Sequence, residues 1–245
     1  MKGHSAIRPL GRQRGVNVRT RLCGILVLCP MLRRALSWLW PMPEAIAEGR
    51  SGKLEVRWEN GRKVLNSPNG NQSFGALHRV WQRTLAHLDL ASKPPRSVLM
   101  LGLGAGSAPT VLRDELGVKC PITAVELDPV VVRLARSHFQ LDRFADLDVI
   151  VGDATIQVHA LRDRYDLVLV DLFDDLDLAR GVDSRSFIHG LRDRCSETGT
   201  VCLNTVAYDT ASDRRCQAVH DHAGRVFHGL EELRLEEVNR MFIAW

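Results

Sequence analysis

The stretch VLMLGLGAGSAP, residues 98–109, decides the fold of this chain. Its apolar run ends abruptly in three glycines spaced two residues apart, Gly102, Gly104 and Gly106. The run is typical of a buried strand, and the following residues, APTVLRDELG, read as a helix. Glycine at such a turn permits unusual backbone dihedrals and lets a ligand approach the main chain, while the helix start offers unpaired N–H groups. The stretch therefore predicts a strand, a glycine turn and a helix at a ligand site.

Short apolar runs alternate with helical patterns in the rest of the chain. Strands are expected near residues 97–101, 122–126, 147–151, 166–171 and 199–204, and two more near 230–236 and 239–245. Alternation of this kind predicts a doubly wound, Rossmann-like α/β fold with helices on both faces of a seven-stranded sheet. Ligands of such folds bind at the carboxyl ends of the strands.

A smaller unit precedes this fold. KLEVRW and RKVLN are alternating segments separated by Glu59, Asn60 and Gly61, and Asn-Gly between strands is a strong hairpin signal. The segment SFGALHRVWQRTLAHLDL then has apolar residues at three- and four-residue steps, which predicts an amphipathic helix. We therefore divide the chain into an N-terminal extension (1–49, expected to be poorly ordered), a hairpin and helix (50–95), and the α/β domain (96–245).

Composition narrows the class of protein. The chain has 245 residues, 45% hydrophobic and 25% charged, as a globular protein does. Seven arginines lie in the first 34 residues, so the remainder is close to neutral and nucleic-acid binding is not implied. Six cysteines without metal-ligand spacing indicate reduced, buried thiols in a cytoplasmic protein.

The segment RLCGILVLCPML, residues 21–32, follows basic residues as the apolar part of a secretion signal would. Pro30 interrupts it, Arg33 and Arg34 follow it, and it is shorter than the ~20 residues that span a bilayer. A loosely attached extension with no membrane role is the preferred interpretation.

Acidic residues end the two strands that follow the glycine turn. Glu126 lies 20 residues after Gly106, where a carboxylate can accept both ribose hydroxyl hydrogens. Asp128 and Pro129 read as the N-cap and first residue of the next helix. Asp153 in VGDA suits the exocyclic amine of adenine. These strand ends together predict an adenosine site, whereas the fingerprint of a dinucleotide site is not matched because Ser stands at position 107.

The next strand carries the most distinctive segment, YDLVLVDLFDD, in which Asp171 and Asp174 mark the strand end and the following loop. Together with VLMLGLGAGS, VELD and VGDA, it resembles the polyamine aminopropyltransferases, the spermidine synthases. These share the fold of class I S-adenosylmethionine-dependent methyltransferases. The resemblance runs from about residue 53 to 204 and includes the order of hairpin, helix and glycine turn.

The resemblance implies a reaction and a set of site residues. Asp171 would be the base that receives the acceptor amine and Asp174 the second carboxylate that holds it. The implied acceptor is a small molecule such as a polyamine, and the donor is S-adenosylmethionine or its decarboxylated form. No metal is implied, because the thioether leaves a sulfonium as a neutral group. In the family the hairpin helps to build dimers, which suggests a homodimer. The implied nucleoside contacts are Gln72, Gly102, Gly104, Gly106, Glu126, Asp153 and Ala154, and the implied acceptor pocket includes Trp81 and Gln82.

Three departures from the family pattern keep alternatives open. Ala105 replaces an aspartate that receives the amino group of the decarboxylated donor, so methyl transfer from intact S-adenosylmethionine to a small molecule is a second hypothesis. Arg83 replaces an acid and would repel a diamine if it faced the pocket. Asp175 replaces a proline. A non-catalytic relative that binds the nucleoside is a third hypothesis.

Overall fold

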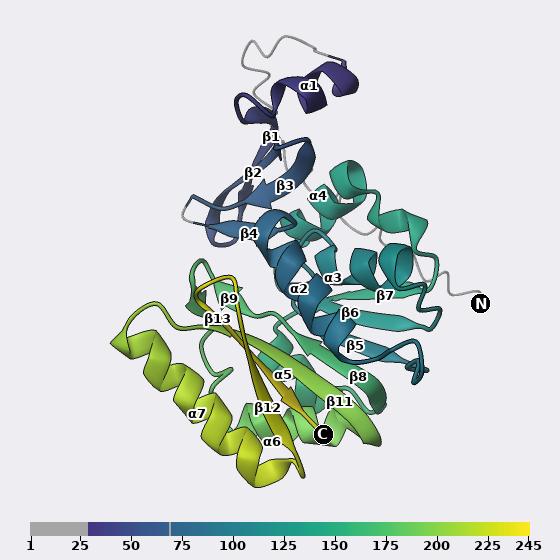
Figure 1. The fold of residues 1–245 in the computed structure, drawn as a ribbon, viewed down its shortest axis with the longest axis vertical. Coiled ribbons are helices and arrows are strands. Elements are labelled where there is room, and N and C mark those ends of the chain that lie inside the picture. The colour runs from purple at the N-terminus through teal and green to yellow at the C-terminus, as the bar shows by residue number, and fades with distance from the viewer. Residues whose placement is uncertain (1–28, 69) are drawn as a thin grey trace, which may run out of the picture.

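The computed structural model describes residues 29–68 and 70–245 (Figure 1). Its larger part is a seven-stranded sheet with the strand order β12-β13-β11-β8-β5-β6-β7. The strands are β5 (Val98–Leu101), β6 (Ile122–Glu126), β7 (Leu147–Val151), β8 (Tyr165–Val170), β11 (Cys195–Val206), β12 (Leu230–Leu235) and β13 (Asn239–Ala244). Strands β11 to β7 run parallel, and β13 pairs antiparallel with both of its neighbours. The predicted α/β fold is confirmed.

Helices cover both faces of this sheet, because alternate residues of the central strands point to opposite sides. Val98 and Met100 belong to one buried cluster, and Leu99 and Leu101 to the other. The helices of the first face are α2 (Gly75–His87), α3 (Ser107–Thr110), the π-helical turn η1 (Val111–Glu115), α4 (Pro129–Phe139) and the short turn η2 (Leu141–Arg143). Those of the second face are α5 (Ala154–Ala160), α6 (Arg185–Arg194) and α7 (Thr210–Val226).

The N-terminal unit is a four-stranded antiparallel sheet in chain order, which lies above α2 in Figure 1. Its strands are β1 (Met42–Gly49), β2 (Gly52–Glu59), β3 (Arg62–Asn66) and β4 (Asn71–Ser73), and the helix α1 (Pro30–Leu36) precedes them. The predicted hairpin is β2–β3, and its turn residues Asn60 and Gly61 have φ values of 49° and 75°.

The expected extension, residues 1–49, needs a correction within the described residues. The segment 42–49 is strand β1 and pairs with β2 along its whole length. Gly49 and Gly52 read as a flexible joint in the sequence, but they close the tight β1–β2 turn, where Gly52 has φ 110°. The strand was missed because MPEAIAEG contains few residues that favour strands. Most of the apolar segment 21–32 and Cys23 lie outside the described residues.

Four of the predicted buried thiols are confirmed. Cys120, Cys195, Cys202 and Cys216 are free and buried, whereas Cys29 is free but exposed, which contradicts the expectation for that residue. In the part of the chain that the structure describes, no helix has the length and apolar character needed to cross a membrane.

Candidate active site

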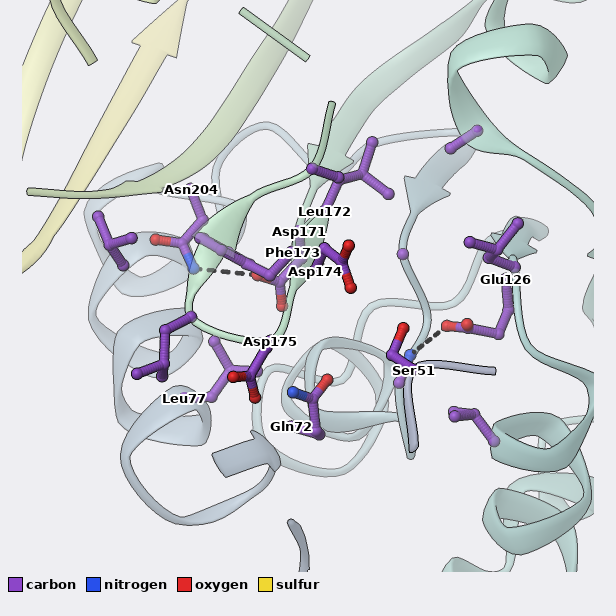
Figure 2. A pocket seen from close by; sticks show the side chains of 18 of the residues that line it. Ser51, Gln72, Leu77, Glu126, Asp171, Leu172, Phe173, Asp174, Asp175 and Asn204 are labelled. Atoms are coloured by element: carbon purple, nitrogen blue, oxygen red, sulfur yellow. Dashed lines mark hydrogen bonds between the residues drawn. The ribbon is translucent and has the colours of Figure 1, made fainter. Parts of the chain in front are cut away.

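A cavity of about 700 Å³ lies at the carboxyl ends of β5, β6 and β8 (Figure 2). Its size lies within the range of small-molecule and cofactor sites. The N-terminal sheet closes it from one side through Gln72 and the β1–β2 turn. Of the residues predicted from the sequence, the wall contains Gln72, Gly102, Gly104, Glu126, Asp153, Ala154, Asp171 and Asp174.

The glycines of the turn allow the backbone of other segments of the chain to approach closely. A Cβ atom on Gly102 would lie 2.0 Å from the carbonyl oxygen of Asp171, and one on Gly104 would lie 3.1 Å from that of Gln72. Both residues, with φ values of 90° and 56°, adopt a backbone conformation that favours glycine. Gly106, with φ 95°, precedes α3 and does not line the cavity, and a Cβ atom on it would lie 2.8 Å from the side chain of Leu141. The turn therefore brings the end of β8 and strand β4 against the end of β5.

Glu126 is held by main-chain amides at the end of β6. Its Oε2 atom accepts hydrogen bonds from the N–H groups of Leu103 (3.1 Å) and Gly104 (2.9 Å), and its Oε1 atom accepts one from Asp128 (3.0 Å). Burial raises the pKa of Glu126, and the three amides oppose that effect. A carboxylate has about four acceptor positions, so one remains for a ligand hydroxyl.

Asp128 joins the N-terminal sheet to this end of the cavity. One carboxylate oxygen accepts from the N–H of Val130 at 2.8 Å and caps α4, as predicted. The other accepts from the N–H of Arg50 in the β1–β2 turn at 2.5 Å. Arg50 and Ser51 consequently line the cavity, and Figure 2 shows Ser51 beside Glu126. Sequence reasoning missed both residues because it missed β1.

Asp153 follows β7 and caps α5. Its Oδ1 atom accepts from the N–H of Thr155 at 2.8 Å and from the hydroxyl of the same residue at 2.7 Å. Its side chain is exposed, and the next residue, Ala154, is buried in the wall. Asp153 and Ala154 therefore form the part of the cavity wall that follows β7.

Asp171 follows β8 and is held from two sides by side chains. The indole Nε1–H of Trp81 donates to Oδ2 at 2.9 Å, and the amide of Asn204 donates to Oδ1 at 3.0 Å. The second bond is drawn in Figure 2. Burial raises the pKa of Asp171 to about 6, although both donors oppose it, and the charge of Glu126 adds to the increase. A carboxyl group that titrates near neutral pH is suited to general-base chemistry.

Two further carboxylates surround the same space in Figure 2. Asp174, in the short strand β9 (Phe173–Asp174), is exposed and lines the cavity; β9 pairs with β10 (Asp177–Leu178). Asp175 accepts a hydrogen bond from the hydroxyl of Ser67 at 2.8 Å and has φ 60°. Proline cannot adopt that φ, which gives the departure from the family pattern at this position a physical reason.

The structure does not bring Trp81 and Gln82 onto the cavity wall, and the expectation that both would line it is corrected. Trp81 is fully buried and reaches the site only through Asp171. Gln82, the next residue of α2, lies about 100° further around the helix. There its amide donates to Glu115 at 2.7 Å.

Two departures noted in the sequence also lie away from the cavity. Arg83 is 58% exposed and forms an ion pair with Glu236 at 3.2 Å, so it does not face the site. Ala105 is buried, and its N–H donates to the hydroxyl of Ser73 at 3.0 Å. The glycine turn thus contributes no acid to the cavity.

The model of the spermine/spermidine synthase domain matches residues 78–227. The chain belongs to the spermine/spermidine synthase family. It is 27% identical over 203 residues to the polyamine aminopropyltransferase of Chromobacterium violaceum, covering 82% of this chain and 74% of that one. The polyamine aminopropyltransferase of Vibrio vulnificus is 28% identical over 164 residues, and these span 66% of this chain but only 54% of that protein.

Methyltransferases are also similar to this family member. The eEF1A lysine and N-terminal methyltransferase of Danio rerio is 31% identical over 163 residues, covering 61% of this chain and 23% of that protein. Among solved structures, a probable spermidine synthase from Corynebacterium glutamicum superposes with a TM-score of 0.65 at 18% identity, covering 82% of this chain and 79% of that one. Human methyltransferase-like protein 13 in complex with SAH superposes with a TM-score of 0.57 at 24% identity, covering 69% of this chain and 82% of that one. These likenesses show a shared fold.

Sequence reasoning missed two asparagines of the wall in this spermine/spermidine synthase family member. Asn204 interrupts the apolar strand β11 and Asn239 begins β13, and the amide of Asn239 donates to Oδ1 of Asn204 at 3.0 Å. An asparagine inside VCLNTV was the available signal, because a buried amide needs partners. No group of three or more His, Cys, Asp or Glu residues that could hold a metal ion occurs in residues 29–68 and 70–245.

Proposed function

We propose that this member of the spermine/spermidine synthase family transfers an alkyl group from an S-adenosylmethionine-type sulfonium nucleoside to a small amine. The observation that carries the proposal is Asp171, a half-buried carboxylate with a pKa raised to about 6 in the same cavity as the predicted nucleoside residues. A carboxylate in that place attracts the acceptor ammonium and then takes the proton that it loses before attack.

The donor would occupy the side of the cavity that Glu126 and Asp153 line. Glu126 would receive the ribose hydroxyls and Asp153 the adenine amine, with Gln72, Ala154 and the glycine turn completing the nucleoside site. The sulfonium carries a positive charge that the nearby carboxylates stabilise, and it leaves as a neutral thioether. Positioning of donor and acceptor therefore supplies most of the rate enhancement, and we propose a reaction without a metal ion.

The acceptor would lie between Asp171 and Asp174. The side chain of Asp174 forms no hydrogen bond or ion pair with the described residues, so it is available to a second ammonium group of a polyamine. Since Arg83 faces away, it does not oppose that binding. We propose a polyamine-like acceptor, action in the cytoplasm and a homodimeric assembly, with no nucleic-acid or membrane partner.

Methyl transfer is the second candidate, and the position of Ala105 favours it. Because Ala105 is buried and away from the cavity, no acid from the glycine turn would pair with the amine of a decarboxylated donor. Intact S-adenosylmethionine would then bind at least as well. An Ala105→Asp variant is a poor test, since it places a charge in the core.

Titration calorimetry with S-adenosylmethionine, its decarboxylated form and methylthioadenosine, followed by transfer of labelled donor carbon to a panel of amines, tests the proposal. We expect binding of the nucleosides and label transfer to at least one amine, at a rate that rises with pH through about 6. The donor whose label moves decides between aminopropyl and methyl transfer. Binding without any transfer would favour the non-catalytic alternative, and the absence of binding would contradict the nucleoside site.

A further inference from the structure

A directed chain of side-chain hydrogen bonds crosses the sheet from β13 to Asp171. Asn239 donates to Asn204 at 3.0 Å, and Asn204 donates to Asp171 at 3.0 Å. Trp81 completes the chain from α2 with its bond of 2.9 Å to the other carboxylate oxygen. Asn204 and Trp81 are fully buried, so water does not replace these partners.

The direction of the chain follows from what an amide can donate and accept. A side-chain amide has one oxygen acceptor and one NH₂ donor. If Asn204 were reversed, its oxygen would face the carboxylate of Asp171 and its NH₂ would face the NH₂ of Asn239. Both contacts would be repulsive. The carboxylate of Asp171, which can only accept, therefore requires the NH₂ end of Asn204, and Asn239 stabilises that orientation by donating to the opposite end.

We propose that Asn204, oriented by Asn239, is a positioning residue that fixes the carboxylate of Asp171 toward the acceptor. This inference rests on the proposed function, in which Asp171 is the base. Trp81 alone would leave the carboxylate free to turn about its bond to the indole. The donor from the opposite side removes that rotation, and a near-attack geometry depends on such restraint.

The charges around Asp171 predict how it responds when this donor is lost. Glu126, at the end of β6, repels the ionised form of Asp171. Asp174 and Asp175, which follow β8, line the same cavity. The cations of the wall are Arg50 and Arg180. The hydrogen bond from Asn204 favours the ionised carboxylate. Its removal should therefore raise the pKa of Asp171 further.

The indole N–H signal of Trp81 in a ¹H–¹⁵N NMR spectrum reports this protonation without any turnover, because the group donates directly to Asp171. A Trp81→Phe variant assigns the signal. In the wild type it should titrate near pH 6. In Asn204→Leu the midpoint should move up by about one pH unit, and in Asn239→Ala by a smaller amount in the same direction. The double variant should match Asn204→Leu, since Asn239 acts through Asn204.

Thr205→Val is the matched control. Thr205 is the next buried residue of β11, and its hydroxyl donates to the carbonyl of Arg240 at 2.7 Å, away from Asp171. This variant loses a buried hydrogen bond but should keep the wild-type midpoint. Asn239 is only half-buried, so Asn239→Ala keeps the inference testable if Asn204→Leu does not fold.

The rate of label transfer gives a second readout. The acid limb of the pH–rate profile should shift upward with the NMR midpoint in both asparagine variants, and activity should recover at high pH. A midpoint unchanged from the wild type in both variants would overturn the positioning role, whatever the activity. A loss of rate that is equal at every pH would also overturn it, since that is the behaviour of general damage to the fold. Absence of transfer by the wild type contradicts the proposed function, while a shifted NMR midpoint would still support the contact between Asn204 and Asp171.

Discussion

The two ends of the cavity hold their carboxylates in different ways. At the donor end, Glu126 accepts only from main-chain amides, and Asp128 and Asp153 cap the helices that start beside them. At the acceptor end, Asp171 accepts from side chains that are 90 and 33 residues away in the chain. Every residue except proline has a main-chain donor, whereas particular side chains must be brought to the site by other helices and strands. Substitutions elsewhere in the molecule should therefore disturb the acceptor end more than the donor end.

Replacement of Asp171 should have the largest effect. Asp171→Asn removes the proton acceptor, and we expect turnover to fall by roughly 10²–10⁴ while nucleoside affinity barely changes. The NH₂ group of the new amide would also face a donor, either Trp81 or Asn204. This repulsive contact should lower thermal stability.

The double variant Asp171→Asn with Asn204→Asp separates these two effects. Its amide at position 171 can donate to the new carboxylate, which accepts from Asn239 as well, so thermal unfolding should return toward the wild-type temperature. Label transfer should stay low because the base has moved. Undiminished transfer in the single variant would contradict the role of Asp171 at the acceptor end.

Gly102 links the two ends, and its replacement should have the next largest effect. In Gly102→Ala the new Cβ meets the carbonyl of Asp171 at 2.0 Å in a backbone conformation with φ 90°. We expect a loss of about 3 kcal/mol in the free energy of unfolding, measured by urea denaturation. Gly117→Ala is the control, because Gly117 has φ 67° but no neighbour within 4 Å, and only strain of roughly 1–2 kcal/mol should result. Equal losses would show that the contact with Asp171 is unimportant.

Glu126→Ala tests the donor end. Loss of charge-assisted hydrogen bonds to the ribose should weaken nucleoside binding by about 1.5–3 kcal/mol, or roughly ten- to a hundredfold, in titration calorimetry. Three main-chain amides also lose their acceptor, so the glycine turn should loosen. Glu126→Gln retains one oxygen and should lose less. Unchanged affinity in Glu126→Ala would remove Glu126 from the nucleoside site.

Arg83→Ala should have the smallest effect, and it tests whether the acceptor end extends as far as Arg83. The exposed ion pair with Glu236 stabilises the fold by no more than about 0.5 kcal/mol. Since Arg83 faces away from the cavity, KM for an amine acceptor should not change. A fall in that KM would show that the charge of Arg83 does reach the acceptor.

The central strands β5 and β8 were predictable because each is a nearly continuous apolar run buried on both faces. The positions of Glu126, Asp153 and Asp171 followed directly, since parallel strands present their carboxyl ends at one edge. Strand β1 was not predictable, because MPEAIAEG gains its strand conformation from pairing with β2 rather than from its own residues. Because β1 was not predicted, Arg50 and Ser51 were not predicted as residues of the site.

Local periodicity and backbone conformation specify the order of strands and helices in the large α/β domain, the glycine turn and the acids at the strand ends, and these features were readable from the sequence. Only the packed fold sets which side chains surround those acids. It turned Trp81 inward to Asp171 and Arg83 outward to Glu236, and it placed Asn204 and Asn239 in one hydrogen-bonded chain. Such contacts depend on the rotation of α2 and on the pairing of β11 with β13. Both are fixed by the packing of the whole core, which no local stretch of sequence contains.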